Sequence, residues 1–169
     1  MYVHWPAREY DAEETLAAFN GLYDDGLIDR IGISNFEPEQ VAEAVGISDA
    51  PIFANQVELH PLLQQEELRE ACTEHDVEIV AYSPLARGGV FDVPELTEIA
   101  EKHDASEAQV SLAWLREKGV TAIPKATSEA HIRDNWESLG VALDGEDVAT
   151  IDAIDREDRR VDPGFAPWN

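Results

Sequence analysis

Short apolar runs rich in valine and isoleucine alternate with longer amphipathic segments along most of this chain. The apolar runs predict strands at 1–4, 30–34, 53–58, 78–83 and 121–124. Enough residues lie between consecutive runs for a helix, and this order is typical of parallel strands joined by crossover helices. The pattern therefore predicts an α/β fold with one parallel sheet.

Helix signals occupy the intervals between the predicted strands. Asp11 with Glu14, and Ser106 with Gln109, have the spacing of a capping box, and Pro38 suits the first turn of a helix. Glycines are placed to end the helices that these signals begin. The predicted helices cover 11–26, 38–46, 64–75, 106–119, 128–139 and 145–155, with a glycine-containing loop at 87–93 and an extended tail at 161–169.

The length of the chain bounds how much of a barrel it can build. We expect a single domain over residues 1–169, because no linker or low-complexity segment interrupts it. A TIM-type (β/α) barrel of eight units takes about 250 residues. The chain supplies about five strand–helix units, so we expect a partial barrel. Because Met1 falls directly inside the first predicted strand, the missing units are expected on its amino-terminal side, and the chain is expected to be truncated.

The charge balance is strongly acidic. Asp and Glu number 36 against 12 Lys and Arg, which gives a formal net charge of -24 and a pI near 4.2. Such a surface repels nucleic acid and anionic membranes, so neither is expected as a partner. We interpret the charge as halophilic adaptation, since high salt screens self-repulsion. No signal peptide or long apolar stretch occurs, so a cytoplasmic protein is expected.

Polar residues close every predicted strand. The carboxyl ends of parallel barrel strands meet on one side of the barrel, where active sites form, so these residues predict a shared rim. The histidines and the single Cys72 show no metal-ligand spacing, so no metal site is expected, and Cys72 is expected to be a buried thiol. The strand-end residues are His4, Ser34, Asn35, Asn55, Gln56, Tyr82, Ser83 and Lys125.

Five motifs in this order resemble the aldo-keto reductases: YVHWP at 2–6, GISNF at 32–36, NQVE at 55–58, AYSPL at 81–85 and IPK at 123–125. The resemblance covers nearly the whole chain, from about the fourth barrel strand onward. It implies an oxidoreductase that uses NADPH to reduce aldehydes or ketones to alcohols by hydride transfer. The partners it implies are a nicotinamide cofactor and a small carbonyl substrate.

The resemblance also implies roles for individual residues. His4 matches the histidine that orients the substrate carbonyl, and Trp5 matches a residue lining the substrate pocket. Ser34, Asn35 and Gln56 match residues that bind the nicotinamide carboxamide. Each of these roles has a structural alternative. His4 could form hydrogen bonds only with backbone groups, and Trp5 could serve only to pack the barrel. The buried polar residues 34, 35 and 56 could serve only to hydrogen-bond groups of the protein itself.

Further residues match the remaining parts of the cofactor site. Tyr82 matches the ring on which nicotinamide stacks, and Lys125 is placed for an adenosine 2'-phosphate, which favours NADPH over NADH. The loop at 86–89 matches a pyrophosphate-binding segment, or else it is a flexible turn. The complete set of implied cofactor-binding residues in this half of the chain is Tyr82, Ser83, Leu85, Arg87, Lys125, Ala126, Thr127, His131, Asp134 and Asn135.

The departure from the family concerns the catalytic residues. The aspartate, tyrosine and lysine of the family lie on strands before the one that opens this chain, so they have no counterpart here. Three explanations stay open: an incompletely assigned start or truncated form of an enzyme, a non-catalytic NADPH-binding remnant, or a subunit completed by another chain. The two unpaired strand edges of a partial barrel also favour self-association.

Overall fold

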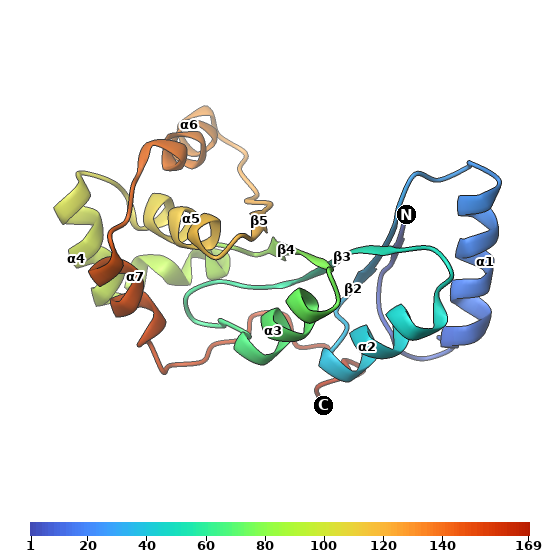
Figure 1. Ribbon diagram of the computed structural model, residues 1–169. Helices are drawn as coiled ribbons and strands as arrows, with labels where there is room; N and C mark the ends of the chain where they lie inside the picture. Colours follow the sequence, from blue (N-terminus) through green and yellow to red (C-terminus); the bar gives the residue numbers. More distant parts are fainter. The chain divides into compact units, whose positions relative to one another are not determined.

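The computed structural model describes all 169 residues, and its strands form one five-stranded sheet in the order β1-β2-β3-β4-β5 (Figure 1). β1 pairs with β2, and β2 pairs with β3, in parallel. Strands that are consecutive in the chain are therefore neighbours in the sheet, and the predicted parallel α/β fold is confirmed. The strands are β1 (Tyr2–Val3), β2 (Ile31–Ser34), β3 (Ile52–Glu58), β4 (Glu78–Tyr82) and β5 (Thr121–Ala122).

Backbone contacts divide the chain into two compact units. The first unit contains residues 1–57, 65–80 and 162–169, and the second contains 58–64 and 81–161. β3 and β4 contribute residues to both units.

The first unit packs three helices with its strands: α1 (Ala12–Asp24), α2 (Pro38–Ile47) and α3 (Glu66–Glu74). Each helix buries a large apolar side chain: Leu16, Val41 and Leu68 are 0, 0 and 3% exposed. The Asp11 carboxylate caps α1 by accepting from the Glu14 backbone N–H at 2.9 Å, as the predicted start of this helix requires. Cys72 is a free, buried thiol, and burial raises its pKa to about 11.

Gly32 in β2 allows an aromatic ring to lie directly against the strand backbone. A Cβ atom at this position would come within 2.5 Å of Tyr2 Cε1. The register places Tyr2 opposite Gly32, which explains why the ring is there. A larger residue at Gly32 would therefore displace Tyr2 from the sheet.

The second unit packs around α5 (Glu107–Glu117), together with α4 (Pro94–His103), α6 (Glu129–Glu137) and α7 (Gly145–Asp152) (Figure 1). Trp114 of α5 is completely buried, and its indole N–H donates to Asp152 at 2.8 Å. The Ser106 hydroxyl caps α5 by accepting from the Gln109 backbone N–H at 3.1 Å. The Gln109 side chain donates a hydrogen bond to Asp134 and does not accept one from the Ser106 backbone N–H. Only half of the predicted capping box therefore forms.

Several predicted boundaries differ from the structure, and one helix was not predicted. α4 was not predicted, although it has a proline, Pro94, in its first turn, where proline is favoured. The predicted loop at 87–93 falls within a 3-10 segment, η1 (Ala86–Asp92), interrupted by left-handed residues. α3 begins only at Glu66 because Gln65 is left-handed, with φ 46°. α7 ends at Asp152 instead of 155. β5 ends at Ala122, two residues before Pro124, which cannot donate a backbone hydrogen bond.

The acidic residues outnumber the basic ones threefold, so ion pairs cannot neutralise the surface. We expect the melting temperature to rise when NaCl is increased from about 0.1 M to about 2 M, because salt screens repulsion between the carboxylates. Differential scanning fluorimetry measures this change. Glucose at the same osmolality serves as the control, since it does not screen charge. An unchanged or lower melting temperature in NaCl would contradict the halophilic interpretation.

None of the helices combines the length and the hydrophobicity that crossing a bilayer requires.

Candidate functional site

In the first unit, the ends of three neighbouring strands are joined by side-chain hydrogen bonds. The Asn35 amide donates to the His4 carbonyl at 3.0 Å and to the Ser34 hydroxyl at 3.1 Å. The Ser34 hydroxyl in turn donates to the Gln56 carbonyl at 2.7 Å. Asn35 adopts a left-handed conformation with φ 63°, which turns the chain immediately after β2. The structure thus brings His4, Ser34, Asn35 and Gln56 together, as expected from the parallel sheet.

These four residues differ in how much of their side chain is available to a ligand. Ser34 and Asn35 are buried at 3% exposure each, and they hold the strand ends in place. The His4 ring is exposed, the Gln56 side chain is half-buried, and neither makes a hydrogen bond in the structure. The Gln56 amide and the His4 imidazole are therefore the groups of this set that can bind a ligand.

An aromatic cluster lies beside His4. Trp5 contacts Phe165 edge to face with ring centroids 5.4 Å apart, and it contacts Trp168 at 5.6 Å. The Arg8 guanidinium sits 4.5 Å from the centre of the Phe165 ring. The tail aromatics therefore pack on the residue predicted to line a substrate pocket. The contact of Arg8 with the Phe165 ring was not predicted. In the sequence, a single arginine in a loop cannot be distinguished from a solvated surface residue.

In the second unit, Tyr82 ends β4 and a tight loop follows. Burial, with a smaller contribution from Glu58, raises the pKa of Tyr82 to about 12, so its hydroxyl stays protonated. Ser83, Ala86 and Arg87 all have positive φ values of 48°, 47° and 52°. Successive residues with helical and left-handed conformations can aim backbone N–H groups at an anion. Arg87 is exposed on this loop, and Leu85 is half-buried between Ser83 and Arg87.

Gly89 is buried in the loop, which bears on the alternative that the loop is only a flexible turn. A Cβ atom at Gly89 would collide with the Arg160 guanidinium and approach the Ala86 Cβ at 3.3 Å. The loop is also held from the α5 side, where the Ser111 hydroxyl donates to the Pro84 carbonyl at 2.8 Å. The loop is therefore a tightly packed turn.

Lys125 lies three residues before the capped start of α6. The Ser128 hydroxyl accepts from the His131 backbone N–H at 3.2 Å and so begins the helix. Lys125 is exposed, and it makes no ion pair or hydrogen bond in the structure. Ala126 and Thr127 lie between Lys125 and the cap. An unpaired cation next to a helix amino terminus suits an anionic ligand.

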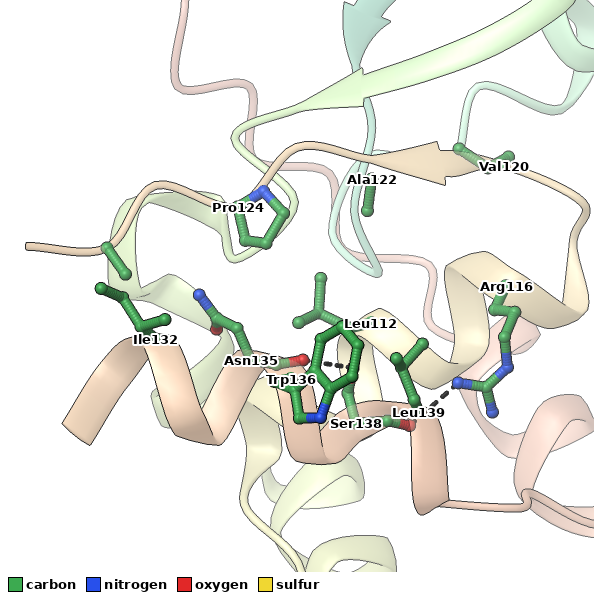
Figure 2. A pocket seen from close by; sticks show the side chains of 11 residues that line it. Leu112, Arg116, Val120, Ala122, Pro124, Ile132, Asn135, Trp136, Ser138 and Leu139 are labelled. Atoms are coloured by element: carbon green, nitrogen blue, oxygen red, sulfur yellow. Dashed lines mark hydrogen bonds between the residues drawn. The ribbon is translucent and has the colours of Figure 1, made fainter. Parts of the chain in front are cut away.

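Asp134 and Asn135 lie further along α6. The Asp134 carboxylate accepts hydrogen bonds from the Ser106 hydroxyl at 2.9 Å and from the Gln109 side chain at 2.7 Å. Asp134 therefore fastens α6 to α5, a structural role in addition to the adenine contact implied by the resemblance. The Asn135 side chain points into a groove between α6 and β5 (Figure 2).

A buried carboxylate, which sequence analysis did not single out, ends β3. Glu58 is 1% exposed and pairs with completely buried His60 at 3.1 Å between Oε1 and Nε2. It also accepts from the backbone N–H groups of Arg160 and Val161 at 2.9 and 2.8 Å. Burial alone would raise the Glu58 pKa, but these hydrogen bonds together lower it. A glutamate at the end of the predicted strand 53–58 was the available signal. No group of three potential metal ligands occurs in the structure.

In parallel α/β folds, barrels included, the sites form at the carboxyl ends of the strands, and this sheet gathers polar residues at those ends. A sequence profile of the aldo/keto reductase family matches residues 1–156, and the chain belongs to this family. The resemblance given by the five motifs is therefore confirmed. The roles of individual residues stay predictions.

Known relatives are longer than this chain. It is 40% identical over 157 residues to glyoxal reductase of Bacillus subtilis, covering 93% of this chain and 56% of that protein. It is 37% identical over 174 residues to methylglyoxal reductase DkgB of Escherichia coli O157:H7, covering 99% and 64%. The chain thus spans little more than half the length of several relatives.

Solved structures share its fold. A crystal structure of a candidate 2,5-diketo-D-gluconic acid reductase B superposes with a TM-score of 0.93 at 35% identity, covering 98% of this chain and 59% of that one. An aldo-keto reductase from a deep-sea metagenome library of the Medee basin gives a TM-score of 0.88 at 27% identity, with coverages of 98% and 63%. The predicted partial barrel is therefore confirmed, and its sheet is not closed.

Proposed function

We propose that this chain forms the cofactor-binding part of an NADPH-dependent oxidoreductase that reduces aldehydes or ketones to alcohols. Membership of the aldo/keto reductase family supports oxidoreductase chemistry on carbonyl compounds. The observation that carries the proposal is the hydrogen-bonded set at the ends of β1, β2 and β3, in which Asn35 joins His4 to Ser34 and Gln56. A rigid set of neutral amide and hydroxyl groups suits recognition of a carboxamide.

The residues present fit the nicotinamide end of the cofactor. Gln56 has an unpartnered side-chain amide, and in our proposal it binds the carboxamide while Ser34 and Asn35 hold the strand ends in position. Tyr82 stays neutral, so its ring offers a flat, uncharged surface for stacking. When bound, NADPH would supply the hydride.

The phosphate groups are assigned to the second unit. Lys125 supplies an unpaired cation before α6, and Arg87 supplies another in the loop after β4. In an acidic protein with only 12 basic residues, two unpaired cations next to backbone N–H groups are well suited to phosphates. His131 lies in the first turn of α6 and complements them. This assignment favours NADPH, which carries one phosphate more than NADH.

The substrate carbonyl is assigned to His4. Its ring is exposed and makes no hydrogen bond, so it can donate to a carbonyl oxygen and orient it. Trp5, with Phe165 and Trp168 packed on it, offers an apolar wall beside that position. The substrate portion next to the carbonyl would accordingly pack on aromatic rings.

A second candidate function is a non-catalytic NADPH-binding subunit or remnant. Within residues 1–169, which cover 56% of the Bacillus subtilis enzyme, the resemblance assigns no counterparts of the family's catalytic aspartate, tyrosine and lysine. Both candidates bind NADPH. They differ in turnover.

Titration with NADPH tests the shared part of both candidates. We expect NADPH to quench tryptophan fluorescence, and Lys125→Met to weaken NADPH binding about 10- to 100-fold, since a charged hydrogen bond contributes about 1.5–3 kcal/mol. NADH binding should change little, because it lacks the 2'-phosphate. The measurement is the dissociation constant of each cofactor for each variant.

Lys118→Met is the matched control for this titration, since it removes the same charge from a lysine that pairs with Asp152 at the far end of α5. It should leave the affinity for NADPH unchanged. Folded protein that shows no quenching with NADPH would refute the proposed cofactor site. Equal losses of NADPH and NADH affinity in Lys125→Met would refute the assignment of Lys125 to the 2'-phosphate.

A further inference from the structure

Arg8 carries a positive charge that no side chain of this acidic protein neutralises. Its side chain is exposed, and it makes no hydrogen bond or ion pair in the structure. It does not pair even with Glu9, its neighbour in the chain. Acidic residues outnumber basic ones 36 to 12, so an arginine without a carboxylate partner is unexpected on this surface. The free charge therefore calls for an explanation.

A tight turn orients Arg8. The Tyr10 backbone N–H donates to the Ala7 carbonyl at 3.3 Å, and Arg8 follows Ala7 with a left-handed backbone, φ 62°. The Tyr10 ring packs on Phe36 with centroids 5.5 Å apart, which fixes the far end of the turn. A left-handed backbone is unfavourable for a residue with a Cβ atom, and such residues are found where the surroundings hold them, often at functional sites.

The Arg8 guanidinium lies over an aromatic ring. Its Cζ atom is 4.5 Å from the centre of the Phe165 ring, within the range of a cation–π contact. This contact restricts the side chain, yet none of its five N–H donors has an acceptor in the protein. A planar group held in this way matches the two oxygen atoms of a carboxylate.

The ring beneath Arg8 belongs to the aromatic cluster beside His4. Phe165 contacts Trp5 at 5.4 Å, and the Trp5 ring lies 6.0 Å from the His4 ring. All these residues belong to the first unit. The apolar wall therefore has the unpaired His4 imidazole at one side and the unpaired Arg8 guanidinium at the other.

An acidic group of the same segment already has partners. Asp162 accepts hydrogen bonds from the Trp168 indole N–H and from the Asn169 side-chain amide, at 2.9 Å each. The first of these bonds holds Trp168 in its contact with Trp5, where the ring centroids are 5.6 Å apart. Asp162 thus stabilises the aromatic wall and does not neutralise Arg8.

We propose that Arg8 is a specificity-determining residue that selects carbonyl substrates carrying a carboxylate. The substrate carbonyl lies at His4, and its apolar portion packs on Trp5 and Phe165. Its carboxylate accepts two parallel hydrogen bonds from Arg8. A chain with a net charge of -24 repels anions in general, so a free arginine determines where a carboxylate can bind. The inference rests on the proposed function, which assigns the carbonyl to His4.

Two aldehydes of nearly the same shape test the proposal. 4-Formylbenzoate carries an aldehyde and a carboxylate on one ring, and methyl 4-formylbenzoate is its neutral ester. The protein is saturated with NADP⁺, so that no hydride is available to reduce them. Ligand-observed NMR titrations then give the dissociation constants at one fixed NaCl concentration, since salt weakens interactions between charges. We expect 4-formylbenzoate to bind more tightly than the ester.

Arg8→Met removes the charge and keeps an unbranched apolar side chain. It should weaken binding of 4-formylbenzoate about tenfold, the lower end of what a hydrogen bond to a charged group contributes, and leave the ester unaffected. Arg8→Lys keeps the charge without the planar group and should restore part of the lost affinity.

Arg30→Met is the matched control. Arg30 is also exposed and also lies over an aromatic ring, with Cζ 3.9 Å from the centre of the Phe53 ring, so its replacement removes the same charge from a similar contact. It should leave the affinities for both aldehydes unchanged. Circular dichroism of each variant verifies that the chain is folded.

Four results would overturn the proposal. Equal weakening of both aldehydes in Arg8→Met would show that Arg8 only packs the aromatic segment against Trp5. Weaker NADPH binding in Arg8→Met would identify Arg8 as a cofactor contact. Binding of both aldehydes without a preference for the carboxylate would refute the role of Arg8 and leave the proposed function intact. Binding of neither aldehyde by protein that binds NADPH would refute the assignment of the carbonyl to His4 as well.

Discussion

Glu58→Ala is expected to lower the free energy of unfolding by about 3–5 kcal/mol, because it removes a buried carboxylate and leaves several buried hydrogen-bond partners unsatisfied, at a cost of about 1–3 kcal/mol each. The substitution would leave His60 and the backbone N–H groups of Arg160 and Val161 without their hydrogen-bond partner inside the protein. A loss of this size is a large part of a typical total of about 5–15 kcal/mol. Urea unfolding followed by circular dichroism measures it.

The pH dependence of the same variant separates the charge from the packing. The Glu58 pKa is lower in the folded protein than its usual value. The stability that Glu58 contributes is therefore fully present above about pH 4.3, the usual pKa of a glutamate. It is lost as the pH falls through the pKa that Glu58 has in the folded protein. Between pH 5 and pH 3 the unaltered protein should therefore lose more stability than Glu58→Ala does. Glu157→Ala, at an exposed position, is the control for both measurements. A cost below about 1 kcal/mol, as for surface ion pairs, would contradict the buried role.

Reduction of small aldehydes by this chain alone is expected to be slower than that of a complete aldo-keto reductase by at least about 10²- to 10⁴-fold, the usual contribution of general acid catalysis. A proton donor works best when its pKa lies near the working pH. Burial is the main factor that raises the pKa of Tyr2, of Tyr10 to about 12 and of Tyr82 to about 12. With pKa values raised in this way, none of these three phenols is suited to act as the proton donor for an alkoxide.

Oxidation of NADPH in the presence of methylglyoxal, followed in molar salt, measures this rate. Tyr82→Phe is the informative variant, since it should leave any residual rate unchanged if Tyr82 only stacks on the cofactor. Turnover near 1–10³ s⁻¹ by the chain alone would show that it contains a proton donor that the resemblance does not identify. A slow rate together with tight NADPH binding would favour the non-catalytic alternative for the isolated chain.

Local signals predicted much of the fold because each element carries its own start and stop. Asp11 and Ser106 mark helix starts through hydrogen bonds within one turn, and the structure contains both. The end of α7 and the short β5 were harder, because they depend on a turn at Ile154 and on Pro124 respectively. α4 was missed because its capping position, Val93, has no polar side chain to mark it.

The candidate site was predictable wherever a motif sits at a strand end. His4, Asn35 and Gln56 come together because consecutive parallel strands end on the same side of a sheet. The contacts of Glu58 with residues about 100 positions later could not be foreseen, since no local pattern reports which backbone amides approach a buried carboxylate. The same holds for Arg8 over the Phe165 ring.

The way in which Glu58 holds residues 160 and 161 has a consequence for sequence variation. The carboxylate binds main-chain N–H groups, so the attachment does not depend on which side chains stand at these two positions. Almost any residue can replace Arg160 or Val161 without loss of these hydrogen bonds, and only proline, which has no N–H, cannot. Positions 160 and 161 can thus change their surface chemistry in evolution or in engineered libraries while this anchor stays in place.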